Sequence, residues 1–166
     1  GSKIEDNARI VATLKTLEAL IEGGAKIILI SHLGRPKGKP EPKYTLKPVA
    51  EELSKLLKKP VAFAADCIGA SVDKAIAALK PGDILMLENL RFHAEEEAND
   101  PAFAKALAKN ADLFIQDAFG ALHRAHASTA GVAKLLPGAI GFLVQRELEF
   151  LDRTIGHPTR PFVAII

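Results

Sequence analysis

The sequence has no tryptophan, one tyrosine (Tyr44), one cysteine (Cys67) and one methionine among its 166 residues. So few flat aromatic side chains argue against a surface that stacks nucleic-acid bases. A lone cysteine excludes an internal disulfide and is typical of a reducing compartment. No apolar run approaches the roughly 20 residues of a membrane-spanning helix, and no stretch resembles a signal peptide. We therefore expect a cytoplasmic protein that binds neither nucleic acid nor a membrane.

What is present is the composition of an ordinary globular protein. Apolar residues make up 48% of the chain and charged residues 25%, and a chain of this length can bury a core of its own. The formal net charge is +2, so no overall field attracts a polyanion. Any positive charge that matters for function must therefore be local.

Three apolar segments each end in a group of polar and cationic residues. They are residues 26–30 before Ser-His-Leu-Gly-Arg-Pro, 83–87 before Glu-Asn-Leu-Arg-Phe-His, and 112–115 before a loop that contains His-Arg-Ala-His at 123–126. A strand that is apolar on both faces belongs inside a covered parallel sheet. Ligands of such sheets bind beyond the carboxyl ends of the strands. Because these ends share one edge, we predict one anion site there.

Helical and strand patterns alternate along the chain. We expect helices over about 7–22, 45–59, 71–79, 101–110, 128–136 and 142–155, and strands at 26–30, 61–64, 83–87, 112–115 and 162–166. Thr45 and Asp100 are expected to cap their helices, and the acidic segment 93–99 is expected to be a solvated loop. Such alternation predicts a three-layer α/β/α sandwich with a parallel, Rossmann-like sheet.

The arginines are the strongest candidates for ligand binding. Arg35, Arg91 and Arg124 follow three different strands, and Arg9 lies in the first turn of the opening helix. Guanidinium groups bind carboxylate and phosphate oxygens in pairs, so a compact dianion or trianion would suit them. Any single arginine is more simply a solvated surface residue, but three at strand ends favour a binding patch.

Four histidines accompany these arginines: His32, His93, His123 and His126. We interpret them as neutral donors to a phosphate or as structural hydrogen-bonding residues. His123 and His126 could suggest a metal, but a zinc site needs further ligands, and Cys67 is not obviously placed to supply one. We expect no metal site. No GxxxxGK[ST] or GxGxxG motif occurs, so we also expect no bound cofactor.

Three motifs, taken together and in order, carry a family resemblance. They are Ser-His-Leu-Gly-Arg-Pro (31–36), Leu-Glu-Asn-Leu-Arg-Phe (87–92), and Asp-Ala-Phe-Gly with His-Arg-Ala-His-Ala-Ser (117–128). With them, residues 3–166 resemble the N-terminal, substrate-binding domain of phosphoglycerate kinase. The resemblance implies phosphoryl transfer from 1,3-bisphosphoglycerate to ADP, which yields 3-phosphoglycerate and ATP in glycolysis. It also implies a second domain that binds magnesium ATP or ADP, and a hinge that closes the two domains.

The same resemblance implies roles for particular residues. His32, Leu33, Gly34, Arg35, Arg91 and Arg124 would hold 3-phosphoglycerate. Arg9 would contact the substrate carboxylate and, on closure, stabilise the moving phosphoryl group, which makes it the catalytic residue. Gln116 stands where the family usually has asparagine. No residue matches the family's first strand, whose motif is of the type Arg-Val-Asp-Phe-Asn-Val-Pro.

These differences predict an incomplete domain at residues 3–157, followed at 158–166 by a linker and the first strand of the nucleotide domain. Without that second domain, we expect this chain alone to be inactive as a kinase. We expect residues 162–166 to occupy the slot of the missing central strand, within the chain or by strand exchange in a homodimer. The alternative is an engineered or evolutionary fragment with a structural or assembly role and no ligand.

Overall fold

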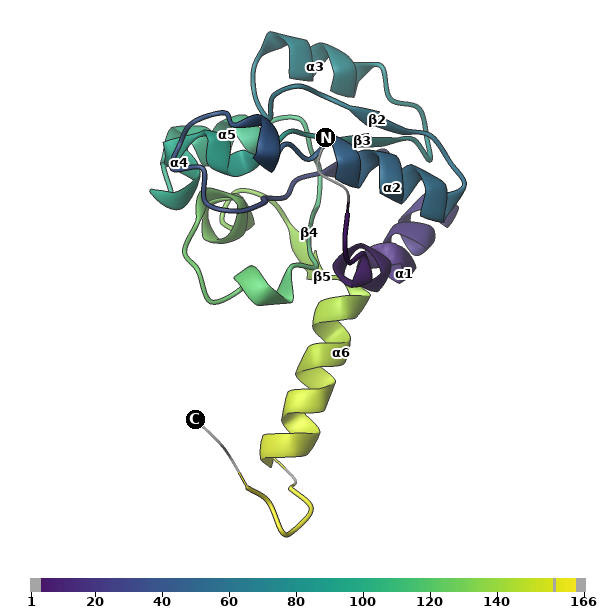
Figure 1. The fold of residues 1–166 in the computed structure, drawn as a ribbon, viewed down its shortest axis with the longest axis vertical. Coiled ribbons are helices and arrows are strands. Elements are labelled where there is room, and N and C mark those ends of the chain that lie inside the picture. The colour runs from purple at the N-terminus through teal and green to yellow at the C-terminus, as the bar shows by residue number, and fades with distance from the viewer. Residues whose placement is uncertain (1–3, 157, 164–166) are drawn as a thin grey trace.

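The computed structural model describes residues 4–156 and 158–163, in which helices alternate with parallel strands (Figure 1). The elements are α1 (Ala8–Glu22), β1 (Ile27–Leu29), η1 (Pro42–Tyr44), α2 (Lys47–Leu57), β2 (Val61–Phe63), α3 (Ala70–Ala77), β3 (Ile84–Met86), η2 (Leu90–Phe92), α4 (Ala94–Glu97), α5 (Pro101–Ala108), β4 (Phe114–Gln116), η3 (Phe119–Ala121), η4 (Ala127–Gly131), β5 (Gly138–Ile140), α6 (Phe142–Leu151) and η5 (Asp152–Gly156). Every α-helix among them is too short or too polar to cross a membrane.

The strands form two parallel groups. One sheet has the order β1-β3-β2, with Ile84 of β3 opposite both Ile27 and Val61. The other pairs β4 with β5, with Phe114 opposite Gly138. The sequence did not predict β5, because its three residues are exposed and carry no apolar run. Its pairing comes from the β4 backbone rather than from buried side chains.

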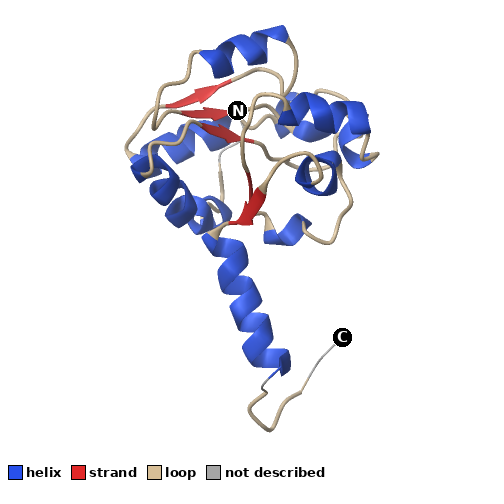
Figure 2. Cartoon of the chain, turned by 180° about the vertical axis from the view of Figure 1, so that it is seen from behind, coloured by secondary structure: helices blue, strands red, loops and turns tan. Residues whose placement is uncertain are grey.

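The central strand β3 is covered by helices on both faces of its sheet. Ile84 and Met86 pack with α1 and α2, in a cluster that includes Leu17 and Leu53. The intervening Leu85 belongs to a second cluster on the other face, with residues of α3 and α5. Successive side chains of a strand point to opposite faces, so a fully apolar strand is buried on both. Figure 2 shows helices on both sides of the three-stranded sheet, and the predicted α/β/α sandwich is confirmed.

Helix starts follow the predicted capping residues in one case and differ in another. The Asp100 carboxylate accepts a hydrogen bond from the Phe103 amide at 2.8 Å, so the cap of α5 is confirmed. The helix α2 begins at Lys47 after Leu46, which differs from the expected Thr45 cap. The Thr45 hydroxyl, one position earlier, accepts from the Lys47 amide at 3.3 Å and donates to the buried Glu88 carboxylate at 2.5 Å. Thr45 therefore does contact the first turn of α2, and a tertiary contact is added to this local one.

The acidic segment was predicted wrongly. Residues 94–97 form the short helix α4, and Glu96 is 1% exposed. The carboxylate is buried because donors from residue 128 reach it, as described below. The next expected helix, at 128–136, begins one residue earlier, at Ala127, as the π-helical turn η4.

The helix α6 projects away from the two sheets, and the chain after it continues beyond its far end (Figure 1). The expected strand at 162–166 is described only at its first two residues. Phe162 and Val163 are 45% and 78% exposed and have no strand assignment. Residues 164–166 lie outside the described residues, so insertion of this strand, in one chain or between two, stays a prediction.

Candidate anion-binding site

The site lies where the loops after β1 and β3 run side by side. The two strands are hydrogen-bonded neighbours in parallel register, so their carboxyl ends leave the sheet together. The Leu90 amide donates to the Ser31 carbonyl at 3.1 Å and continues the pairing beyond the strands. The predicted convergence on one edge is therefore confirmed for these two loops. The third predicted strand, β4, pairs instead with β5 in the other sheet, so its loop does not leave from the same sheet edge.

Asn89 fixes both loops from inside. Its side chain is fully buried, and its amide nitrogen donates to the carbonyls of Leu33 and Tyr44 at 2.8 and 2.9 Å. Its carbonyl oxygen accepts from the Arg91 amide at 3.0 Å. A buried side-chain amide with all these partners fixes the positions of both loops, because losing any of the hydrogen bonds leaves a buried polar group unsatisfied. The sequence reasoning did not single out Asn89, although a polar pair inside an apolar run was a signal.

The other member of that pair, Glu88, holds the start of α2 against the site. One carboxylate oxygen accepts from the amides of Leu46 and Asn89, each at 2.8 Å, and the other accepts from the Thr45 hydroxyl. These donors compensate the burial of a charged group that is 8% exposed.

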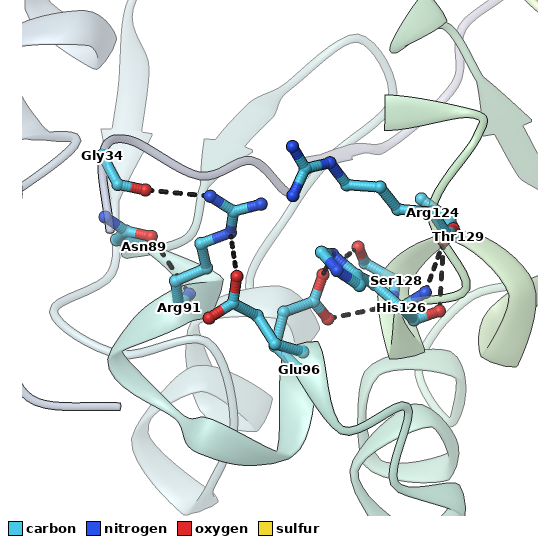
Figure 3. A network of polar contacts seen from close by, with 9 residues as sticks. Gly34, Asn89, Arg91, Glu96, Arg124, His126, Ser128 and Thr129 are labelled. Carbon is cyan, nitrogen blue, oxygen red and sulfur yellow. Dashed lines mark hydrogen bonds and ion pairs between the residues drawn. The ribbon is translucent and has the colours of Figure 1, made fainter. Parts of the chain in front are cut away.

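Arg91 is a buried cation with free donor capacity. It is 4% exposed, and its Nη1 donates to the Gly34 carbonyl at 2.9 Å (Figure 3). Its Nε lies 3.4 Å from a carboxylate oxygen of Glu97. Its Nη2 is buried and has no hydrogen-bond partner among the described residues. Buried polar groups are rarely left without a partner, so this donor points to an acceptor supplied by a ligand.

Gly34 is required for the approach of its loop to Arg91. Its φ is +67°, a conformation that side chains rarely adopt, and an added Cβ would overlap the Tyr44 ring. The absence of a side chain therefore lets the Gly34 carbonyl reach the guanidinium.

Arg124 extends toward the Arg91 guanidinium from the opposite side (Figure 3). Its backbone is held by Thr129, whose hydroxyl donates to the Arg124 carbonyl at 2.7 Å. The same hydroxyl accepts from the His126 amide at 3.0 Å. Behind this turn, Glu96 accepts from the amide and the hydroxyl of Ser128 at 3.0 and 2.5 Å. The loop that presents Arg124 is thus tied to α4.

The pKa of His32 is lowered by its surroundings in the site. Desolvation by neighbouring atoms lowers the pKa of His32 to about 4, although the residue keeps an exposed surface, and Arg91, His126 and Arg124 lower it further. Glu97 acts in the opposite direction. His32 is therefore neutral near pH 7 and can donate a hydrogen bond to an anion without adding charge.

The structure brings together most of the residues that the sequence singled out. His32, Gly34, Arg91 and Arg124 surround one region, and Leu33 contributes its carbonyl to Asn89. The side chains of two predicted residues, Arg9 and Arg35, are exposed and form no hydrogen bond or ion pair with the part of the chain that the structure describes. The converging groups are cationic or neutral donors, an arrangement that binds and orients an anion.

Comparisons with known proteins point to one family. The family model described as phosphoglycerate kinase matches residues 1–166. The chain is 58% identical over 166 residues to phosphoglycerate kinase of Moorella thermoacetica, covering 100% of this chain and 42% of the relative. It is 58% identical over 164 residues to the chloroplastic phosphoglycerate kinase of Chlamydomonas reinhardtii, covering 98% and 36%.

A solved structure shows the same fold. The crystal structure of phosphoglycerate kinase from Pyrococcus horikoshii OT3 matches with a TM-score of 0.88 and 36% identity, covering 96% of this chain and 40% of that one. The chain thus spans about two fifths of the length of the proteins it resembles.

Proposed function

The chain belongs to the phosphoglycerate kinase family and corresponds to its N-terminal part, and from this premise we propose that it binds 3-phosphoglycerate at the Arg91–Arg124 site. The observation that carries the proposal is the buried Nη2 of Arg91, which has no hydrogen-bond partner in the described ranges 4–156 and 158–163 and faces Arg124. A phosphate dianion offers several acceptor oxygens to two guanidinium groups at once.

The remaining predicted residues have proposed roles in the same complex. Neutral His32 and the loop of Leu33 to Arg35 would contact the substrate, and Arg9 would approach its carboxylate from α1. In the whole protein, Arg9 would also stabilise the phosphoryl group in transit. Positioning and charge stabilisation provide most of the catalysis in phosphoryl transfer, and residues of this kind suit that task.

We propose that magnesium ATP or ADP is a co-substrate bound by another part of the protein. The sequence supports this division, since it contains no glycine-rich phosphate motif. The chain by itself would then bind 3-phosphoglycerate and show little or no kinase turnover. Turnover by the purified chain at the rate of a full-length family member would contradict this. A cytoplasmic location is part of the proposal and has the lone cysteine as its support.

Calorimetric titration with 3-phosphoglycerate at low salt tests the binding step. The comparison includes the wild-type chain and the variants Arg124→Ala, Arg91→Lys and Arg35→Ala. Arg146→Ala is the matched control, because it removes the same charge from an exposed position on α6. We expect Arg124→Ala and Arg91→Lys to weaken binding at least about tenfold, which corresponds to one lost charge-assisted hydrogen bond.

Two results would overturn the proposal. One is the absence of binding by a wild-type chain that is folded by circular dichroism. The other is an equal loss in Arg146→Ala, which would show a general charge effect instead of a site. Failure of binding by the folded chain would favour the structural or assembly role that the sequence left open.

A further inference from the structure

A second cluster of ligand-type side chains includes His93, two residues after Arg91. Asp66 and Cys67 follow β2, and His93 follows η2. A carboxylate oxygen of Asp66, the sulfur of Cys67 and a ring nitrogen of His93 all lie within 4.8 Å of one another. These three atoms come from two loops that are distant in the sequence, so the fold itself assembles them.

We propose that Asp66, Cys67 and His93 form a binding site for a transition-metal dication of the zinc class. Cysteine sulfur, imidazole nitrogen and carboxylate oxygen are the ligands that Zn²⁺ prefers, and three protein ligands leave one position for water. This inference does not depend on the proposed binding of 3-phosphoglycerate. It also revises the expectation of no metal site, which considered Cys67 only in relation to His123 and His126.

The Asp66–His93 pair requires only a small adjustment to bind one ion. Asp66 Oδ1 and His93 Nε2 now lie 2.7 Å apart, in direct contact. Two such ligands at about 2.0–2.1 Å from a tetrahedral zinc are separated by about 3.3 Å. The two side chains would therefore separate by roughly half an ångström. His93 would bind through Nε2 with its proton on Nδ1, and the Cys67 thiol would release its proton to solvent as the metal–sulfur bond forms.

The surroundings suit a cation. The Asp66 side chain is 48% exposed and that of His93 is 27% exposed, which leaves a route for entry, whereas Cys67 is buried at 2%. Burial raises the pKa of the Cys67 thiol, and the negative charges of Asp66 and Glu96 raise it further. The same negative charges attract a dication, which would displace the thiol proton on binding. The His93 ring also packs at 5.3 Å from the Phe103 ring, which restricts its orientation.

A metal here would connect the loop after β2 to the loop that carries Arg91. Arg91 is only two residues before the proposed ligand His93. The Asp66 carboxylate already accepts from the Cys67 amide at 2.6 Å, so one ligand is held in place before binding. The metal site would therefore stabilise the loop that carries Arg91 without contacting the anion.

Cobalt titration of the 166-residue chain tests the proposal, because Co²⁺ replaces zinc and is coloured. We expect one Co²⁺ per chain, visible d–d bands of a tetrahedral site and a near-ultraviolet thiolate-to-cobalt charge-transfer band. Zn²⁺ should displace the cobalt and abolish these bands. Cys67→Ser should remove the charge-transfer band, and His93→Gln should weaken binding by about tenfold or more.

The matched control is His123→Gln, an exposed histidine outside the cluster, which should bind cobalt like the wild type. Circular dichroism of each variant identifies any that fail to fold. Absence of the charge-transfer band in the wild-type chain would overturn the proposal whatever the variants do. Survival of the band in folded Cys67→Ser, or its loss in folded His123→Gln, would do the same.

Discussion

The buried carboxylate of Glu96 receives both the backbone amide and the hydroxyl of Ser128, at 3.0 and 2.5 Å. The two residues are 32 positions apart and belong to α4 and η4. Since the carboxylate is 1% exposed, Ser128 provides much of the hydrogen bonding that replaces its hydration. The pair fixes the turn from which Arg124 extends.

Replacing Ser128 by alanine should therefore destabilise the protein. The variant loses the hydroxyl donor to a buried charge, so we expect the free energy of unfolding to fall by about 1–3 kcal/mol. Binding of 3-phosphoglycerate should also weaken, because the Arg124 turn is held less firmly. Urea unfolding and calorimetry measure the two effects. Ser71→Ala, at an exposed position of α3, is the control and should change neither; no difference between the two variants would contradict this role.

Gly34→Ala should affect the site through the backbone. A side chain at φ +67° is strained, and the new Cβ would overlap the Tyr44 ring, so we expect a loss of about 1–3 kcal/mol in the free energy of unfolding. The displaced Gly34 carbonyl would also leave Arg91 Nη1, and affinity for 3-phosphoglycerate should fall. Gly120→Ala is the control, because a Cβ there meets nothing within 4 Å. Equal stability of the two variants would refute the requirement for glycine.

His32 should make stability depend on pH in a defined direction. Its pKa is lowered to about 4 in the folded protein, chiefly by desolvation and then by Arg91, and is about 6.5 in an unfolded chain. Between these values the unfolded state binds more protons, so the contribution of His32 is present above pH 6.5 and is lost as the pH falls toward 4.

The measurement is urea unfolding of the wild type and His32→Gln between pH 4 and pH 7. We expect the difference in unfolding free energy, wild type minus variant, to decrease as the pH falls through this range. Parallel pH profiles would show that the folded protein does not lower the pKa of His32.

Asp117 should anchor α6 to the rest of the fold. One carboxylate oxygen accepts from the amides of Leu143 and Val144 at 2.9 and 3.1 Å, and the other accepts from the Thr16 hydroxyl at 2.6 Å. Asp117→Ala removes this helix cap, so we expect a loss of about 1–2 kcal/mol in unfolding free energy. The exposed Asp112→Ala should change stability by less than about 0.5 kcal/mol. Chemical denaturation of both variants decides the matter, and a neutral Asp117→Ala would exclude an anchoring role.

The sequence was informative where a local pattern has one physical solution. The apolar residues 84–87 required a strand covered on both faces, and the two core clusters on opposite sides of β3 confirm it. Asp100 followed by Pro101 specified a helix start.

The sequence was misleading where a polar residue is buried by distant partners. Three consecutive glutamates normally indicate a solvated loop, yet Glu96 is buried because Ser128 reaches it. The short strand β5 has three exposed residues and is defined only by the β4 backbone beside it. Neither feature leaves a periodic pattern, so neither could be found along the chain.

The sequence by itself therefore determined the alternation of helices and strands, the apolar core, the family and the arginines that follow the strands. Each of these depends on the order of residue types, because burial and backbone preference act over a few neighbouring positions. Only the tertiary structure decided that Arg91 is buried with a donor that no described residue pairs, that Asn89 holds two loops, and that Asp66, Cys67 and His93 meet. These contacts join segments tens of residues apart, and such pairing is fixed by the packing of the whole chain.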